Sequence, residues 1–458
     1  MPLSVWERVK LTLLLCGPAI LAQLASVLLQ FIDASMVGSL GAAPSASIGL
    51  VSTSSWLCGG FCIALAQGFS VQVAHRLGAN DTAGARNVMR QGLLVVTAFS
   101  ILLSAVALGV AGPLPRWLGG EIAIRTDASA YFRIYAAFIP AMQMCFFGAT
   151  MLQCSGDMKI PALLDIMMCV LDVIFNFFLI FPTRDISLFG AVVTVPGAGM
   201  GVSGAALGTG LSEVITAALT MFFLLVRNRD LAIVHHAGSF LPDKDTFKKA
   251  FGITGPLWIQ NLVMRGAYIA STLIVAPLGA VAIAANSFAI VAESFCYMPG
   301  YGMADAATTL VGQSLGASRK DMARSFAQIT IMLGIGMMVS LAVVMYLLAT
   351  PIMSLLSVDS QVVAMGARCL RLEAFAEAGY AASIVAFGAC VGAGDTKIPT
   401  LLNFISVWAV RIVLAIVLTP RYGLMGYWIA MLIELNVRGA LFVGRITGKK
   451  WMMTKLTT

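Results

Sequence analysis

The chain has 458 residues, of which 59% are hydrophobic and only 11% are charged, and its mean hydropathy is +0.91. Soluble domains are about a quarter charged, so this composition excludes a soluble protein and indicates a polytopic helical membrane protein. The net charge of +8 does not indicate a nucleic-acid partner, because Lys and Arg gather in the short segments on one side of the apolar runs.

Apolar segments predict twelve membrane spans, because a helix needs about 20 residues to cross a hydrocarbon core of ~30 Å. The predicted spans cover residues 10–37, 47–74, 92–114, 130–155, 160–182, 201–226, 249–277, 280–312, 324–349, 361–392, 398–419 and 424–444. If both termini are in the cytoplasm, the only Lys or Arg residues in the outer loops are Arg116, Arg125, Arg184 and Arg421. This positive-inside bias places the protein in the cell (inner) membrane with cytoplasmic termini.

The first span contains a lone acid, since Asp33 is the only formally charged residue between Lys10 and Arg76. An ionisable group at the centre of the membrane costs about 2.5 kcal/mol or more, so Asp33 is a candidate functional residue. The alternative is an aspartate that is hydrogen-bonded to a neighbouring helix. Pro18 lies in the same span and predicts a bend, which is either static or a hinge that moves the Asp33 turn.

The fifth span carries Asp165, Asp172 and Asn176, which lie at i, i+7 and i+11 on one stripe of a helix. Asp165 is near the cytoplasmic end, whereas Asp172 and Asn176 are deeper. Two carboxylates that converge with amide oxygens suit either a shared proton or a Na⁺ ion with hard oxygen ligands. We therefore predict an ion-coupling site at Asp33, Asp172 and Asn176, with structural hydrogen bonding as the alternative.

Motifs for other kinds of chemistry are weak or absent. The glycine-rich stretch 196–210 has some likeness to a dinucleotide loop, but we expect no strand before it. No GxxxxGK[ST], HExxH or GxSxG motif occurs, and the nine cysteines show neither CxxC nor zinc-ligand spacing. We therefore expect no enzyme activity, no cofactor and no structural metal, and energy that comes from a gradient or from a partner.

The segment 227–248 is the longest polar stretch, and it includes His235 and His236. We interpret it as a solvated cytoplasmic linker, with a docking site as the less favoured alternative. After the linker, Arg265, Glu293 and Glu377 lie near the middle of spans 7, 8 and 10. Either an Arg265–glutamate pair leaves the other glutamate for substrate or a proton, or the pair only fixes packing.

The two halves of the chain repeat each other with one constant offset. Three pairs of segments match at a spacing of 238 residues: Gly17-Pro18 with Gly255-Pro256, 73–86 with 311–324, and 156–165 with 394–403. Six spans in each half return the chain to the same side, which predicts a parallel repeat around a central cavity. The predicted fold is all-α, with two pseudo-symmetric six-helix lobes at 1–226 and 249–458 joined by the linker.

Several of these motifs resemble the multidrug and toxic compound extrusion (MATE) family. They are Gly-Pro followed by FIDASMVGSLG in span 1, the paired loops of the VGQSLGA type, the GDxKIP turns, and Trp408-x-x-Arg411. The resemblance covers essentially the whole chain. It implies twelve helices around a cavity that alternates between inside and outside, and antiport of organic, often cationic, compounds against Na⁺ or H⁺.

The resemblance also assigns roles to residues. The family's span-1 acid falls on Asp33, its bending proline on Pro18, and its span-5 Asn and Asp on Asp172 and Asn176, with the two residue types exchanged. Second-lobe acids of the family fall on Met264 and Tyr380, where Glu377 is close enough to substitute. The chain is therefore more similar to the branch with a first-lobe coupling site.

Export of a small cationic or amphipathic compound by a monomer in the bilayer is the resulting functional prediction. Arg265, Glu293, Glu377 and Tyr380 are candidates for a second-lobe substrate cavity. The alternative is a flippase for lipid-linked oligosaccharide or a similar amphipathic lipid. Such a flippase would need several cations for phosphates, whereas this chain offers mainly Arg265 at that depth. Both Na⁺ and H⁺ stay open as the coupling ion.

Overall fold

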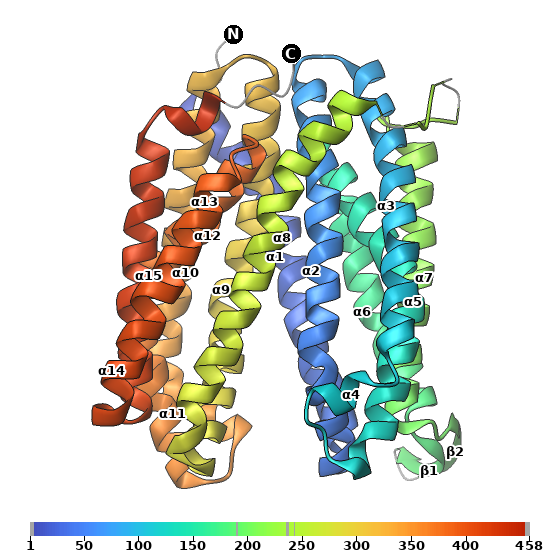
Figure 1. Cartoon of the computed structure of the whole chain (residues 1–458), viewed down its shortest axis with the longest axis vertical. Coiled ribbons are helices and arrows are strands. Elements are labelled where there is room, and N and C mark those ends of the chain that lie inside the picture. The colour runs from blue at the N-terminus through green and yellow to red at the C-terminus, as the bar shows by residue number, and fades with distance from the viewer. Residues whose placement is uncertain (1–3, 189–190, 235–237, 242, 454–458) are drawn as a thin grey trace. The chain divides into compact units, whose positions relative to one another are not determined.

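The computed structural model describes residues 4–188, 191–234, 238–241 and 243–453, and most of them lie in helices (Figure 1). His235 and His236 of the predicted linker lie outside the described residues. The elements up to the linker are α1 (Val5–Gly38), α2 (Ala42–Gly78), α3 (Thr82–Val110), α4 (Leu114–Trp117), α5 (Ile122–Cys154), α6 (Lys159–Leu179), β1 (Pro182–Leu188), β2 (Ala191–Ala198), α7 (Gly201–Phe222) and the π-helix η1 (Phe223–Arg227). The later elements are α8 (Lys244–Val275), η2 (Ala276–Leu278), α9 (Ala280–Gly316), α10 (Lys320–Leu356), α11 (Ser360–Glu373), α12 (Glu377–Gly392), α13 (Lys397–Phe404), the π-helix η3 (Ile405–Ile412), α14 (Val413–Tyr422), α15 (Leu424–Thr447) and η4 (Lys450–Met453).

Ten helical segments among the described residues are long and apolar enough to cross a membrane, and α11 with α12 forms an eleventh if the bent pair is one span. The predicted twelfth span, 424–444, forms α15. This helix is not among the ten segments, although it has 24 residues. The prediction of a helical membrane protein is confirmed.

Two of the predicted spans depart from a regular α-helix in their interior. The predicted span 361–392 consists of two helices, α11 and α12, which are bent by 61° relative to each other. At the bend, the Ala376 amide donates to the Glu373 carbonyl at 2.7 Å, which is a hydrogen bond between residues three apart rather than the four of an α-helix. In the predicted span 398–419, the π-helix η3 replaces eight residues of α-helix and carries Trp408 and Arg411. Such π-helical stretches are rare and are often found at functional sites.

A hairpin of β1 and β2 precedes α7, and the two antiparallel strands pair Arg184 with Val195. The expectation that no strand precedes the glycine-rich stretch 196–210 was therefore wrong, because β2 ends at Ala198. The hairpin still gives no dinucleotide fold, which needs parallel strands on either side of a helix. The Arg184 guanidinium lies over the Phe181 ring at 3.9 Å from its centroid, which holds the hairpin against the end of α6.

The described residues group by contact into two compact units. Unit 1 comprises the described residues within Met1–Leu24, Ala74–Asp81 and Lys249–Thr458, and unit 2 comprises those within Ala25–Val73 and Thr82–Lys248. The helix α1 thus begins in unit 1 and ends in unit 2. In unit 2, α7 packs against both α5 and α6, and in unit 1, α12 packs against α9 and α15. The two sequence lobes remain a prediction from the repeat.

The repeat is visible within unit 1, where the ends of α2 and α9 cross. A Cβ on Gly78 would overlap the carbonyl of Gln313, and a Cβ on Gly316 would overlap the carbonyl of His75. Gly78 and Gly316 occupy equivalent positions in the two repeats, as do His75 and Gln313. The crossing is therefore close to symmetric, and glycine permits the contact on each side because it has no side chain.

Candidate functional site

The three predicted ion-coupling residues come together in unit 2. The Asn176 amide nitrogen Nδ2 on α6 donates to Asp33 Oδ1 on α1 at 3.0 Å and to Asp172 Oδ2 at 3.1 Å. The carboxyl groups of Asp33 and Asp172 also lie within hydrogen-bonding reach of each other. Two carboxylates at this separation repel unless a proton or another cation lies between them. The arrangement is therefore a negatively charged site that can hold one cation.

Several oxygen atoms of this site have no hydrogen-bond partner. Asp172 and Asn176 are fully buried, and the Oδ1 atom of each is without a partner among the described residues. Asp33 is only partly buried, so it is the member of this group that keeps accessible surface. Buried acceptors without partners cost roughly 1–3 kcal/mol each, which a bound cation would recover.

Helix α7 approaches this site closely because it has small residues on the face toward α6. A Cβ on Gly204 would contact the Leu179 carbonyl at 2.6 Å, and one on Gly208 would overlap Asn176 Oδ1. The two glycines are four residues apart, which is the small-xxx-small spacing that lets membrane helices pack closely. The close approach places Thr209 of α7 within hydrogen-bonding reach of Asp172.

Glu213 on α7 belongs to this region, although the sequence argument missed it. It follows Thr209 by one helical turn, and its carboxylate interacts electrostatically with Asp172. It also interacts electrostatically with Cys62 of α2 and with Tyr135 and Cys145 of α5, and the Cys145 thiol donates to the Glu213 backbone carbonyl at 3.3 Å. Glu213 is the only charged residue in 201–226, so the reasoning that selected Asp33 would have selected it as well.

The predicted second-lobe residues lie in unit 1, on α8, α9 and α12. Arg265 on α8 has the phenol groups of Tyr268, Tyr297 and Tyr301 as its identified electrostatic neighbours. Glu293 has an electrostatic interaction with Arg411 of η3. Neither carboxyl oxygen of Glu377 has a hydrogen-bond partner among the described residues, so Arg265 makes no hydrogen bond to Glu377.

Buried glutamates of unit 1 differ in their hydrogen bonding. Glu373 and Glu377, on either side of the bend between α11 and α12, are fully buried, and none of their four carboxyl oxygens has a partner among the described residues. By contrast, Glu434 on α15 accepts from Arg411 at 2.6 and 2.9 Å, from Arg438 at 2.7 and 2.8 Å, and from the Ser406 hydroxyl. Glu434 is thus fully compensated within the protein.

Tyr380 on α12 lies in an aromatic cluster of unit 1. Its ring centroid is 5.4 Å from that of Tyr297, which in turn is 6.2 Å from that of Tyr301. On its other side, the Arg438 guanidinium is 5.8 Å from the Tyr380 centroid. Tyr380 and the partly exposed Tyr301 therefore belong to one cluster of aromatic rings, in which Tyr297 lies between them.

Metal-binding chemistry is not indicated by the side chains. In the described parts of the chain, no group of three or more His, Cys, Asp and Glu residues is placed to hold a metal ion. The nine cysteines are free thiols. His75 is buried, and its Nε2 atom is 2.8 Å from the Gly392 carbonyl oxygen, a hydrogen bond that links α2 to the last residue of α12.

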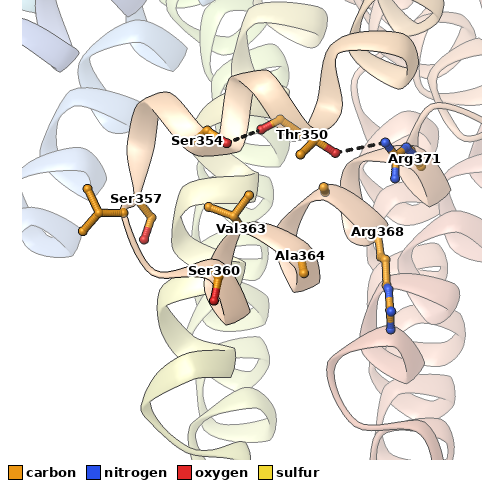
Figure 2. A pocket seen from close by; sticks show the side chains of 10 residues that line it. Thr350, Ser354, Ser357, Ser360, Val363, Ala364, Arg368 and Arg371 are labelled. Atoms are coloured by element: carbon orange, nitrogen blue, oxygen red, sulfur yellow. Dashed lines mark hydrogen bonds between the residues drawn. The ribbon is translucent and has the colours of Figure 1, made fainter.

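An open pocket lies where α10 turns into α11 (Figure 2). Hydroxyl groups and two arginines line it, and the Arg371 Nη2 atom donates to the Thr350 Oγ1 atom at 3.0 Å. Arg368 projects away from Arg371 in this view, so the two guanidinium groups do not converge on one point (Figure 2). None of the acidic or tyrosine residues described above lines this pocket.

Comparisons with known proteins agree with this architecture. The model of the MatE family matches residues 18–178 and 256–417. The probable multidrug resistance protein NorM of Thermotoga maritima is 24% identical over 452 residues, which are 97% of this chain and 92% of NorM. The multidrug resistance protein MdtK of Edwardsiella ictaluri is 26% identical over 461 residues, which are 98% of this chain and 96% of MdtK.

Solved structures share the fold over nearly the full length. A MATE protein crystallised in complex with MaL6 superposes with a TM-score of 0.88 at 20% identity, covering 97% of both chains. The Vibrio cholerae MATE transporter VcmN in its bent form gives a TM-score of 0.85 at 18% identity, covering 98% of both chains. At this level of identity, the likeness supports the fold and leaves the chemistry of the site to the residues themselves.

Proposed function

The chain belongs to the MATE family of transporters, and on that premise we propose that it is an ion-gradient-driven antiporter that exports small organic compounds, cationic or amphipathic, by alternating access. Its relatives NorM and MdtK carry multidrug resistance in their names, which supports efflux as the direction of transport. The single observation that carries the proposal is the group of Asp33, Asp172 and Asn176 with its unpartnered buried oxygens.

Coupling starts when a cation enters this group. A proton would be shared between the Asp33 and Asp172 carboxyls, whereas Na⁺ would be bound by the Oδ1 atoms of Asp172 and Asn176 with an Asp33 oxygen. Either ion neutralises one negative charge in a poorly solvated site. Moving a two-state equilibrium from 1:99 to 99:1 requires about 5.5 kcal/mol of differential binding, and a desolvated ionic site can supply several kcal/mol.

Helix α1 links this charge to a conformational change. Asp33 lies in the part of α1 that belongs to unit 2, and Pro18 lies in the part that belongs to unit 1. Fifteen residues, or about 22 Å of helix, separate them. Pro18 removes one backbone hydrogen bond from α1, which makes this turn the easiest place for the helix to bend. We assign Pro18 the role of hinge.

The test is gradient-driven ethidium transport in inside-out membrane vesicles, with Na⁺ and pH gradients imposed separately. Uptake into these vesicles is expected for the wild type, because their inward direction corresponds to export from the cell. Asp33→Asn should lower gradient-driven uptake about 100-fold, since an amide neither binds a proton nor supplies a carboxylate to Na⁺.

Asp165→Asn is the matched control, because Asp165 lies on the same helix face as Asp172 but is outside the hydrogen-bonded group. It should retain most of the uptake. Undiminished uptake by Asp33→Asn, with normal protein yield and thermal stability, would exclude this site as the coupling site. The gradient that drives the wild type identifies the coupling ion.

A further inference from the structure

The open pocket between α10 and α11 lies in unit 1, at the predicted edge of the membrane (Figure 2). Its lining residues from 350 to 360 fall between the predicted spans 324–349 and 361–392. With the cytoplasmic termini predicted above, the ninth span ends on the outer side, so the pocket is level with the headgroups of the outer leaflet. Its volume of about 630 Å³ is within the range of small-molecule binding sites.

Positive charge and hydroxyl groups dominate the lining of this pocket. Its polar lining residues are Thr350, Ser354, Ser357, Ser360, Arg368 and Arg371. No acid is among the described residues that line it. Asp359 is the N-cap of α11, and its carboxylate accepts from the Gln361 and Val362 amides. The pocket therefore attracts an anion, and its guanidinium and hydroxyl donors are suited to a phosphate group.

The two arginines of the pocket differ in their partners. Arg371 donates to the Thr350 hydroxyl at 3.0 Å. Arg368 is exposed and has neither a hydrogen bond nor an ion pair within the part of the chain that the structure describes. Ser360, Ala364 and Arg368 follow one another at four-residue spacing on one exposed stripe of α11. Because helical side chains incline toward the N-terminus, Arg368 extends back toward Ser360 across the small Ala364. An anion in this space meets a free guanidinium and a hydroxyl group.

An exposed pair of aromatic rings continues this surface toward the membrane interior. Tyr346 on α10 lies four residues before Thr350, and Phe375 lies four residues after Arg371. Tyr346 is 41% exposed and Phe375 is 67% exposed, and their ring centroids are 5.9 Å apart. Because α10 runs outward in the predicted topology, the rings lie one helical turn deeper in the membrane than the bond between Thr350 and Arg371. The surface is thus polar where lipid headgroups lie and aromatic where their acyl chains begin.

We propose that this pocket binds the headgroup of an anionic phospholipid, whose acyl chains lie on the exposed rings of Tyr346 and Phe375. The phosphate accepts from the Arg368 guanidinium and the Ser360 hydroxyl, while Arg371 adds positive charge. A zwitterionic lipid would place its ammonium group in the same positive potential, so a headgroup with net negative charge is favoured. Free phosphate has the same phosphate chemistry but no chains for the aromatic rings, so a lipid is the occupant that uses both parts of the surface.

The test compares phosphatidylglycerol with phosphatidylcholine, both with the same acyl chains and a pyrene label at the end of one chain. Binding to the purified full-length protein in neutral detergent is measured by energy transfer from its tryptophans. The wild type should bind phosphatidylglycerol at least ~10-fold more tightly, which is about 1.4 kcal/mol. Equal affinities, or a preference for phosphatidylcholine, would overturn the proposal. A large excess of inorganic phosphate should leave phosphatidylglycerol bound, and displacement by phosphate would show instead that the pocket takes a free anion.

Arg368→Gln should weaken phosphatidylglycerol about 10-fold and phosphatidylcholine less than about 2-fold, because it removes a charged donor to the phosphate. Folding should be unaffected, since Arg368 is exposed and makes no hydrogen bond among the described residues. Arg421→Gln is the matched control, because it removes an exposed arginine at the end of α14, on the same predicted side of the membrane, and should leave both affinities unchanged. Equal losses of phosphatidylglycerol binding in the two variants would indicate general attraction to positive charge and contradict the assignment.

Phe375→Ala tests the other half of the surface. It removes the exposed ring that packs against Tyr346, so it should weaken both lipids by a similar factor and keep the preference for phosphatidylglycerol. Unchanged binding of both lipids would contradict the position assigned to the acyl chains. Because lipid binding needs no ion gradient and the pocket shares no residue with the group of Asp33, these outcomes are independent of the Asp33→Asn transport result.

Discussion

Glu434 and Glu373 are both fully buried glutamates of unit 1, and they differ in almost every contact. Glu434 accepts hydrogen bonds from Arg411, Arg438 and Ser406, so its charge is neutralised by the protein itself. Both carboxyl oxygens of Glu373 lack a partner among the described residues, and two other acids, Glu293 and Glu377, are nearby. Burial alone therefore does not separate a structural acid from one that is available to bind a cation.

The same distinction identifies the group in unit 2. Asp172 and Asn176 share hydrogen bonds with Asp33, but each keeps one buried oxygen without a partner. A folded protein keeps such a costly arrangement when the missing partner is supplied from outside the chain. On this argument, the number of internal partners, rather than depth, selects the acids that we propose exchange a proton or bind Na⁺.

The strongest test of this comparison is to make the same substitution, Glu→Gln, at Glu434 and at Glu373. Glu434→Gln leaves Arg411 and Arg438 in the interior without a counter-charge, which should cost about 3–5 kcal/mol of folding stability. Glu373→Gln removes no hydrogen bond and should change stability by less than about 1 kcal/mol. Thermal unfolding of the two purified variants in detergent, followed by tryptophan fluorescence, measures both effects.

Glu373→Gln serves as the matched control here, because the residue type, the burial and the chemical change are the same at both positions. The comparison fails if the two variants lose similar stability, or if Glu373→Gln is the less stable. A failure to recover folded Glu434→Gln alongside normal yields of Glu373→Gln counts as the expected result.

A smaller effect on stability is expected when a packing change disturbs the group of Asp33, Asp172 and Asn176 in unit 2. Gly208→Ala places a methyl group against Asn176 Oδ1, so the amide must move away from Asp33 and Asp172. We expect a loss of about 1–3 kcal/mol in stability and a clear drop in gradient-driven transport. Transport in vesicles and thermal unfolding, measured on the same preparation, separate the two effects.

Gly109→Ala on α3 of the same unit is the control, because no atom lies within 4 Å of its added methyl group. This change should be neutral or stabilise the helix by about 0.5–1 kcal/mol. Normal transport by Gly208→Ala would show that the position of the Asn176 amide is not part of coupling.

These contacts show which features the sequence could predict. Asp33, Asp172 and Asn176 stood out because a polar residue in a long apolar run has few explanations, and helical spacing places Asp172 and Asn176 on one face. Asp33 on α1 meets Asp172 and Asn176 on α6 because polar side chains inside the protein need hydrogen-bond partners. The helical membrane fold followed in the same way from composition and from the length of the apolar runs.

Other features had no local signal. The bend between α11 and α12 occurs in a stretch, Glu373 to Glu377, without glycine or proline, so neither propensity nor periodicity marks it. The electrostatic interaction of Glu293 with Arg411 joins α9 to the π-helix η3, which shifts residues away from the positions of a regular helix. Contacts between side chains that are far apart in the sequence depend on tertiary packing, so the pattern of a single sequence does not predict them.

The smallest predicted effect compares the two repeated GDxKIP turns, whose aspartates sit at equivalent positions. Asp395 Oδ2 accepts from Arg445 at 2.7 and 3.0 Å, while Asp157 Oδ1 accepts from the Ile160 amide at 3.1 Å. Asp395→Asn weakens a partly buried charged pair and should cost about 1–2 kcal/mol. Asp157→Asn should cost less than about 0.5 kcal/mol, because asparagine accepts a backbone N–H almost as well as aspartate. Thermal unfolding measures the stability that each variant loses. If the two variants lose equal stability, or if Asp157→Asn loses more, the number of hydrogen-bond partners does not determine the stability contribution of these aspartates as it does for Glu434 and Glu373.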